Sequence, residues 1–180
     1  MRGGREGQSQ GPGSFDPDIV TSGWPIIQTK RSDTFLKLRL EVPNGVYSVC
    51  MTHDELTRLA DNWIRYRYSA KGSSEREVTA WATDLYDLEY DDPETLWLLI
   101  LAIHGKDQSA RVQETLSAGP VEDLLAKHGE RFIDRVEAEA RKDPQFAKLL
   151  GGVWKNSMTD EIWNRVQAVW DRRGWDGVPE

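Results

Sequence analysis

The sequence has little of what cross-linking, metal binding and membrane insertion need: one cysteine, Cys50, three histidines, and no apolar run longer than Leu96 to Ile103. A single cysteine excludes an intrachain disulfide and a cysteine-rich zinc site. The apolar run is far too short to span a bilayer, which takes roughly 20 residues. The arginines near the N-terminus are not followed by an apolar stretch, so no secretory signal is predicted. These absences are typical of a cytoplasmic protein without a membrane partner.

Positive charge is also scarce. The 180 residues carry a formal net charge of −7, with 38% hydrophobic and 29% charged residues. That balance is typical of a globular chain, and the length suits one domain plus a tail. A negative net charge repels phosphate backbones, which argues against nucleic acid as a partner and favours a basic protein. No nucleophile elbow, phosphate-binding loop or dinucleotide fingerprint occurs, so no cofactor is predicted.

Composition divides the chain into three regions. Residues 1–20 are rich in glycine and poor in aliphatic side chains, so they are predicted to be a disordered tail. Residues 21–51 are predicted to be a β-hairpin extension, because apolar and charged residues alternate over 36–42 and the turn signal Asn44-Gly45 follows. Residues 24–27 are a candidate third strand. A lone hairpin is marginal in water, so we expect it to lie against other elements.

Residues 52–175 are predicted to be a helical domain. Capping residues and breaks recur at the intervals of short helices, and the apolar residues between them repeat at helical spacing. The apolar run from Leu96 to Ile103 is typical of a helix that is buried on several sides. The predicted fold class is mainly α, a compact bundle of about eight short helices with an N-terminal β-hairpin, and a short solenoid is the alternative. The predicted helix starts are Thr52, Ser74, Asp92, Asp107, Pro120, Asp143 and Thr159.

Several local expectations follow from this pattern. The helical spacing places Val78 and Trp81 on the buried face of the second helix, and Trp154 on that of the helix opened by Asp143. Ala118-Gly119-Pro120 is expected to end one helix and start the next. Arg172-Arg173-Gly174 is expected to end the last helix, because cations and glycine favour that position.

One block of the helical region is distinctive. It is Ala118-Gly119-Pro120-Val121-Glu122-Asp123-Leu124-Leu125, followed by His128-Gly129 and later by Leu149-Leu150-Gly151-Gly152-Val153-Trp154. Over roughly residues 54–170 the chain resembles an uncharacterised bacterial family classed as a domain of unknown function. The resemblance implies a bacterial source. It implies no activity and supplies no catalytic residues.

The histidines are His53, His104 and His128, and each has a structural interpretation. His104 and His128 both precede a glycine that is expected to end a helix, where an imidazole can bond the last carbonyls and favour the helix dipole. His53 lies in the first turn of the helix capped by Thr52. We therefore favour structural roles over a metal site or a general base.

An enzyme remains an alternative. Glu122, Asp123 and His128, with His104, are the candidates for a hydrolase-type site in which carboxylates and a histidine transfer protons. The competing interpretation is that Glu122 and Asp123 favour the start of a helix after Pro120, and that Asp123 pairs with Lys127 four residues on. Positions 122 and 128 also fall on different faces of a helix, which weakens the acid–base site.

The strongest functional signal is an acidic segment with interleaved tyrosines. No lysine or arginine occurs between Arg76 and Lys106. Clustered charge steers association and tyrosine is favoured in interfaces, so the segment is a candidate docking surface; the competing interpretation is a solvated loop with helix caps at Asp92 and Glu94. The candidate partner-binding residues are Asp84, Tyr86, Asp87, Glu89, Tyr90 and Asp91.

The sequence thus favours a protein–protein interaction module, of the small acidic kind that serves as an immunity protein or antitoxin or regulates a partner. The first alternative is the small hydrolase described above. The second is a structural homo-oligomer, such as a homodimer, in which the apolar face of the hairpin pairs with a second copy.

Overall fold

A computed structural model describes residues 38–42, 45–49 and 51–177 of the chain. The predicted tail 1–20, the candidate strand 24–27 and Cys50 lie outside the described residues. Two short strands, β1 (Leu38–Val42) and β2 (Gly45–Val49), precede the helices in the chain and pair antiparallel. Their register places Leu38 opposite Val49 and Val42 opposite Gly45.

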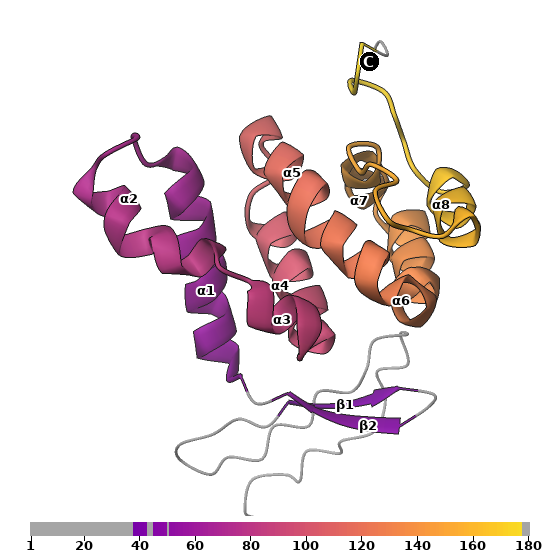
Figure 1. Ribbon diagram of the computed structural model, residues 1–180, viewed down its shortest axis with the longest axis horizontal. Coiled ribbons are helices and arrows are strands. Elements are labelled where there is room, and N and C mark those ends of the chain that lie inside the picture. The colour runs from indigo at the N-terminus through magenta and orange to yellow at the C-terminus, as the bar shows by residue number, and fades with distance from the viewer. Residues whose placement is uncertain (1–37, 43–44, 50, 178–180) are drawn as a thin grey trace, which may run out of the picture.

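The rest of the described chain is mainly helical, which confirms the predicted class (Figure 1). The helices follow one another in approximate chain order along the long axis of the molecule, from α1 and α2 at one end to α7 and α8 at the other. The elements are α1 (His53–Tyr68), α2 (Ser74–Thr79), the 3₁₀ turn η1 (Ala80–Thr83), α3 (Tyr86–Tyr90), α4 (Pro93–Lys106), α5 (Ala110–Leu116), the π turn η2 (Ser117–Val121), α6 (Glu122–Lys142), α7 (Pro144–Leu150) and α8 (Asp160–Gln167).

Four predicted helix starts are confirmed by their capping hydrogen bonds. Thr52 and Glu55 form a reciprocal capping box at the start of α1. Asp92, Asp143 and Thr159 each accept a backbone N–H of the helix that follows. These caps satisfy N–H groups that the first turn of a helix leaves without a partner.

Two other predicted capping residues are wrong. Ser73, rather than Ser74, caps α2 by accepting the N–H of Arg76. Asp107 does not cap the helix after it, because α5 begins three residues later with Ser109 as its N-cap residue. The Asp107 carboxylate instead accepts the Ser109 N–H at 2.9 Å and the Tyr68 hydroxyl at 2.9 Å, so it links α5 to the end of α1.

The predicted stop at Ala118-Gly119-Pro120 is also wrong. The helical path continues from α5 through η2 into α6. Pro120 has no N–H and its ring would crowd the carbonyl four residues earlier, and a wider π turn accommodates both effects without ending the helix. The predicted boundary at His128-Gly129 is confirmed as a kink, because His128 has non-helical angles (φ −133°, ψ 24°) inside α6.

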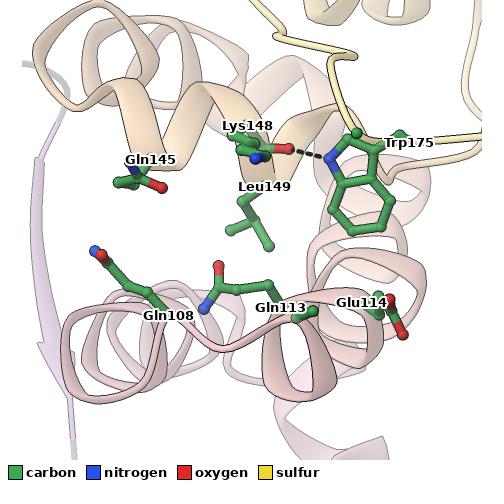
Figure 2. Close-up of a pocket in the computed structure, with 9 residues that line it drawn as sticks. Gln108, Gln113, Glu114, Gln145, Lys148, Leu149 and Trp175 are labelled. Atoms are coloured by element: carbon green, nitrogen blue, oxygen red, sulfur yellow. Dashed lines mark hydrogen bonds between the residues drawn. The ribbon is translucent and has the colours of Figure 1, made fainter. Parts of the chain in front are cut away.

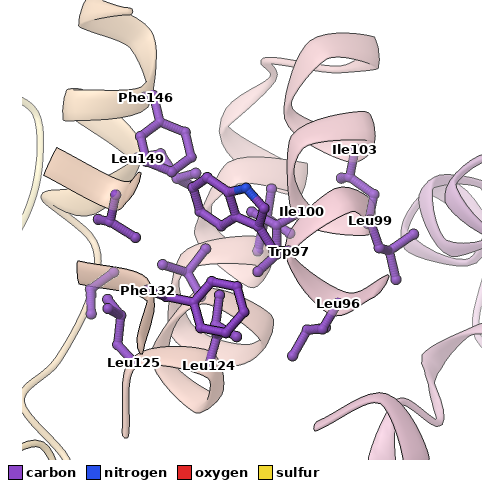
Figure 3. Close-up of a cluster of buried hydrophobic side chains, with 14 of the residues drawn as sticks. Leu96, Trp97, Leu99, Ile100, Ile103, Leu124, Leu125, Phe132, Phe146 and Leu149 are labelled. Carbon is purple, nitrogen blue, oxygen red and sulfur yellow. The ribbon is translucent and has the colours of Figure 1, made fainter. Parts of the chain in front are cut away.

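The core is built around α4, as its apolar sequence predicts. Leu96, Leu99, Ile100 and Ile103 are fully buried. Figure 3 shows Ile100 on the side of α4 that faces α6 and α7, and Leu99 on the opposite side of the helix. The Trp97 ring lies 6.2 Å from that of Phe132 and 5.9 Å from that of Phe146, measured between centroids, so one indole joins three helices.

The C-terminal segment runs back over α7. The helix α8 ends at Gln167, so the predicted helix end at Arg172-Arg173-Gly174 is wrong. The Asp171 N–H donates to the Ala147 carbonyl, and the Trp175 indole donates to the Lys148 carbonyl, each at 2.8 Å. A Cβ on Gly152 would lie 2.5 Å from the Trp175 ring, so this segment packs closely only against glycine.

Candidate functional site

His104 lies in the last turn of α4, but its ring nitrogens contact side chains of Gln113 and Asp143, so its predicted role in capping the last carbonyls is wrong. Its side chain is 5% exposed, and both ring nitrogens have side-chain partners. Nδ1 is 2.9 Å from Oε1 of Gln113 in α5, and Nε2 is 3.0 Å from Oδ2 of Asp143 at the start of α7. The imidazole therefore joins three helices.

Both ring nitrogens of His104 lie within hydrogen-bond distance of a side-chain oxygen. The amide nitrogen of Gln113 donates to the Asp107 carbonyl at 2.6 Å, which turns its oxygen, an acceptor, toward His104. The Asp143 carboxylate is also an acceptor, so both ring nitrogens face acceptor oxygens. Burial alone would raise the pKa of Asp143, but hydrogen bonds from His104 and from the Gln145 and Phe146 backbone lower it overall. The arrangement links α4 to α5 and to the start of α7.

The structure does not bring the other enzyme candidates together. His128 donates from Nε2 to the Glu89 carbonyl at 2.7 Å, which fastens the kink of α6 to α3. Glu122 accepts from the Asn156 side chain at 2.8 Å and from the Trp154 backbone at 3.3 Å. Because α6 continues from η2, Glu122 and Asp123 do not open a helix after a break. The predicted pair of Asp123 with Lys127 is confirmed at 2.9 Å.

A hollow of about 390 Å³ lies beside His104, Lys142 and Asp143, and a smaller one of about 170 Å³ lies between α5, α7 and the C-terminal segment. Figure 2 shows the Trp175 indole on one side of it and the carboxamides of Gln108 and Gln145 on the other. None of the four enzyme candidates lines it. Within residues 38–42, 45–49 and 51–177, no three His, Cys, Asp or Glu side chains are grouped to hold a metal ion.

The acidic segment divides into two sets of carboxylates. Three have intramolecular partners: Asp92 caps α4, Glu89 pairs with Lys127 at 3.0 Å, and Glu94 is buried between Arg131 and Arg135 of α6 at 2.8 Å and 2.6 Å. The other three, Asp84, Asp87 and Asp91, are exposed and pair with no cation in the described part of the chain. The Glu94 ion pairs were not predicted, since they join residues about 40 positions apart.

In the same stretch of the chain as the unpaired carboxylates, large apolar side chains lie at the surface. Val78 and Trp81 are 66% and 53% exposed, so their predicted burial is wrong. The helix α2 ends at Thr79 and the tighter turn η1 follows, and the buried residues of this stretch are Thr79, Ala82 and Leu85. Tyr86 and Tyr90 of α3 are 63% and 52% exposed. We name the following residues the 78–91 surface: Val78, Trp81, Asp84, Tyr86, Asp87, Tyr90 and Asp91.

The rings of Tyr86 and Tyr90 lie side by side on this surface, but a cation of the described chain lies over only that of Tyr90. They are four residues apart on α3, with ring centroids separated by 4.5 Å and ring planes tilted by 36°. The Lys127 ammonium lies 5.0 Å from the centroid of Tyr90 while it bonds Glu89 and Asp123. Burial alone would lower the pKa of Lys127, but these two carboxylates raise it overall, which keeps the ammonium charged.

Trp154 is another exposed aromatic residue, at 64%, although its spacing predicted burial. The helix α7 ends at Leu150, so Trp154 falls in the loop that leads to α8. The Glu122 carboxylate holds this loop through the Trp154 N–H. Among the predicted site residues, only Glu122 forms a described hydrogen bond with this loop.

Comparisons with known proteins place the chain in a family without giving it a function. No helix among the described residues is both long and apolar enough to cross a membrane. No curated protein and no solved structure matches the chain significantly. Residues 69–174, more than half of the sequence, match DUF6869, described as a family of unknown function. The chain therefore belongs to the DUF6869 family.

Proposed function

We propose that this protein is a protein–protein interaction module that binds a basic partner through the 78–91 surface. One observation carries the proposal. Four large apolar side chains, each more than half exposed, occur between positions 78 and 90 beside three carboxylates that have no cation partner in the described chain. Exposed apolar groups rimmed by charge are characteristic of binding surfaces, and aromatic anchors supply much of the binding energy.

Charge supports a basic partner. The chain has a formal net charge of −7, and its longest stretch without lysine or arginine, between Arg76 and Lys106, contains the 78–91 surface. Such a surface attracts a partner of opposite charge and speeds its association. Inhibition or regulation of a basic protein, the role of an immunity protein or antitoxin, fits this chemistry. The enzyme alternative has no comparable support, because its candidate residues lie apart and are engaged in structural contacts.

Affinity capture with matched variants tests the proposal. The full chain, a Trp81→Ala/Tyr86→Ala variant and a Trp154→Ala control would each be used as bait in extracts of the source cells. Trp154 is as exposed as the replaced residues, so the control removes an equal kind of apolar surface elsewhere. We expect a basic protein that binds the parent and the control but not the double variant. A partner retained equally by all three baits would contradict the proposal.

A further inference from the structure

Cations of this protein lie over several of its aromatic rings, Trp63, Trp97 and Trp170 among them. Of the tyrosines at 66, 68, 86 and 90, three have a basic side chain over the ring. Arg76 lies 3.8 Å from the centroid of Tyr66, Arg111 lies 5.3 Å from that of Tyr68, and Lys127 lies 5.0 Å from that of Tyr90. Tyr86 is the exception among these four: the residue is 63% exposed, and no cation of the described chain lies over its ring.

The surroundings of Tyr86 match those of its covered neighbour. At Tyr90, the cation lies over the ring and bonds two carboxylates, Glu89 and Asp123. Beside Tyr86, the carboxylate of Asp84 accepts the Tyr86 N–H at 3.4 Å, and Asp87 is the next residue along α3. Neither carboxylate pairs with a cation in the described chain, so the ring and the acidic groups are present without the positive charge.

We propose that Tyr86, with Asp84 and Asp87, is the binding position for an arginine side chain of the partner protein. The inference rests on the proposed function and specifies its chemistry. Arginine is favoured over lysine because a planar, weakly hydrated guanidinium stacks on an aromatic face and offers several N–H donors to neighbouring carboxylates. Two of the three covered tyrosines have arginine as their cation. Trp81, 53% exposed, adds a second aromatic face for the same segment of the partner.

Defined peptides test the inference independently of partner capture. The probes are acetyl-Gly-Arg-Gly-Arg-Gly-amide and the same peptide with both arginines replaced by citrulline, which keeps the shape but removes the charge. Binding to the full chain would be followed by the aromatic and backbone NMR signals of residues 78–91 at low salt. We expect the arginine peptide to shift the Tyr86 ring signals, and the citrulline peptide to bind at least several-fold more weakly.

Variants of Tyr86 separate a ring contact from general attraction by negative charge. Tyr86→Phe keeps the aromatic face and should bind the arginine peptide like the parent, whereas Tyr86→Leu should bind it about two- to fivefold more weakly, as expected for one exposed cation–π contact. Equal binding by the Leu and Phe variants, equal binding of the citrulline peptide, or shifts confined to residues outside 78–91 would overturn the inference. The proposed function would still stand if the Trp81→Ala/Tyr86→Ala bait lost its partner.

Discussion

The imidazole of His104 and the carboxylate of Asp143 lie 3.0 Å apart, although 39 positions separate them in the chain. The contact joins the buried helix α4 to the N-cap residue of α7. Through Gln113 it extends to α5, so one buried side chain connects three elements of the fold.

Replacement of His104 should therefore destabilise the protein. His104→Leu keeps much of the side-chain volume but leaves the oxygen of buried Gln113 and the Asp143 carboxylate without their donor. We expect a loss of about 2–3 kcal/mol in the free energy of unfolding, the range for hydrogen bonds that involve charged groups. Urea denaturation measures it, with His53→Ala, at an exposed position, as the control that should stay within about 0.5 kcal/mol of the parent. A His104→Leu protein as stable as the parent would refute the role.

The two glycines Gly152 and Gly105 should respond in opposite ways to alanine. A Cβ on Gly152 would lie 2.5 Å from the Trp175 ring and 2.6 Å from the Ser117 hydroxyl, so Gly152→Ala should displace the C-terminal segment and cost about 1–3 kcal/mol, as overpacking does. Gly105 lies in α4 with no atom near its Cβ position, so Gly105→Ala should stabilise by about 0.5–1 kcal/mol. Thermal unfolding compares them, and a neutral Gly152→Ala would contradict the packing.

Acid should weaken the contact between α6 and α8. Hydrogen bonds from Arg165, then from Arg141, lower the pKa of Glu137 from 4.5 to about 2 against the opposing effect of burial. Because the pKa is lower in the folded protein, ionised Glu137 stabilises it fully above pH 4.5, and this stabilisation is lost as the pH falls toward 2. The free energy of unfolding should fall more steeply between these pH values in the parent than in Glu137→Gln. Parallel curves for the two proteins would show that Glu137 makes no such contribution.

Local signals in the sequence predicted much of the helical fold. The caps at Thr52, Asp92, Asp143 and Thr159 involve residues two or three positions apart, so the sequence contains both partners of each bond. The burial of α4 also followed from its composition alone. The expectation failed at Pro120, where a wider π turn occurs in place of a helix end. A proline indicates that regular helical hydrogen bonding is interrupted, but it does not indicate whether the helix ends or continues through a wider turn.

The candidate site was predictable only in part. The acidic residues and tyrosines of 84–91 were identified from sequence, but which carboxylates lack a partner depends on cations some 40 positions away in α6. Val78 and Trp81 were assigned to the core because a continuous helix would bury them. In the structure both are more than half exposed, and α2 ends at Thr79 with the tighter turn η1 after it, a break that helical spacing does not predict.

The binding surface is tested most directly by the dissociation constant of the purified partner for two single variants. Trp81→Ala and Trp154→Ala each remove one indole that is more than half exposed, and they differ in whether that indole belongs to the 78–91 surface. Isothermal titration calorimetry should show Trp81→Ala weakening binding about tenfold or more, as for an aromatic anchor, with Trp154→Ala like the parent. Equal dissociation constants for the two variants would contradict a binding surface at residues 78–91.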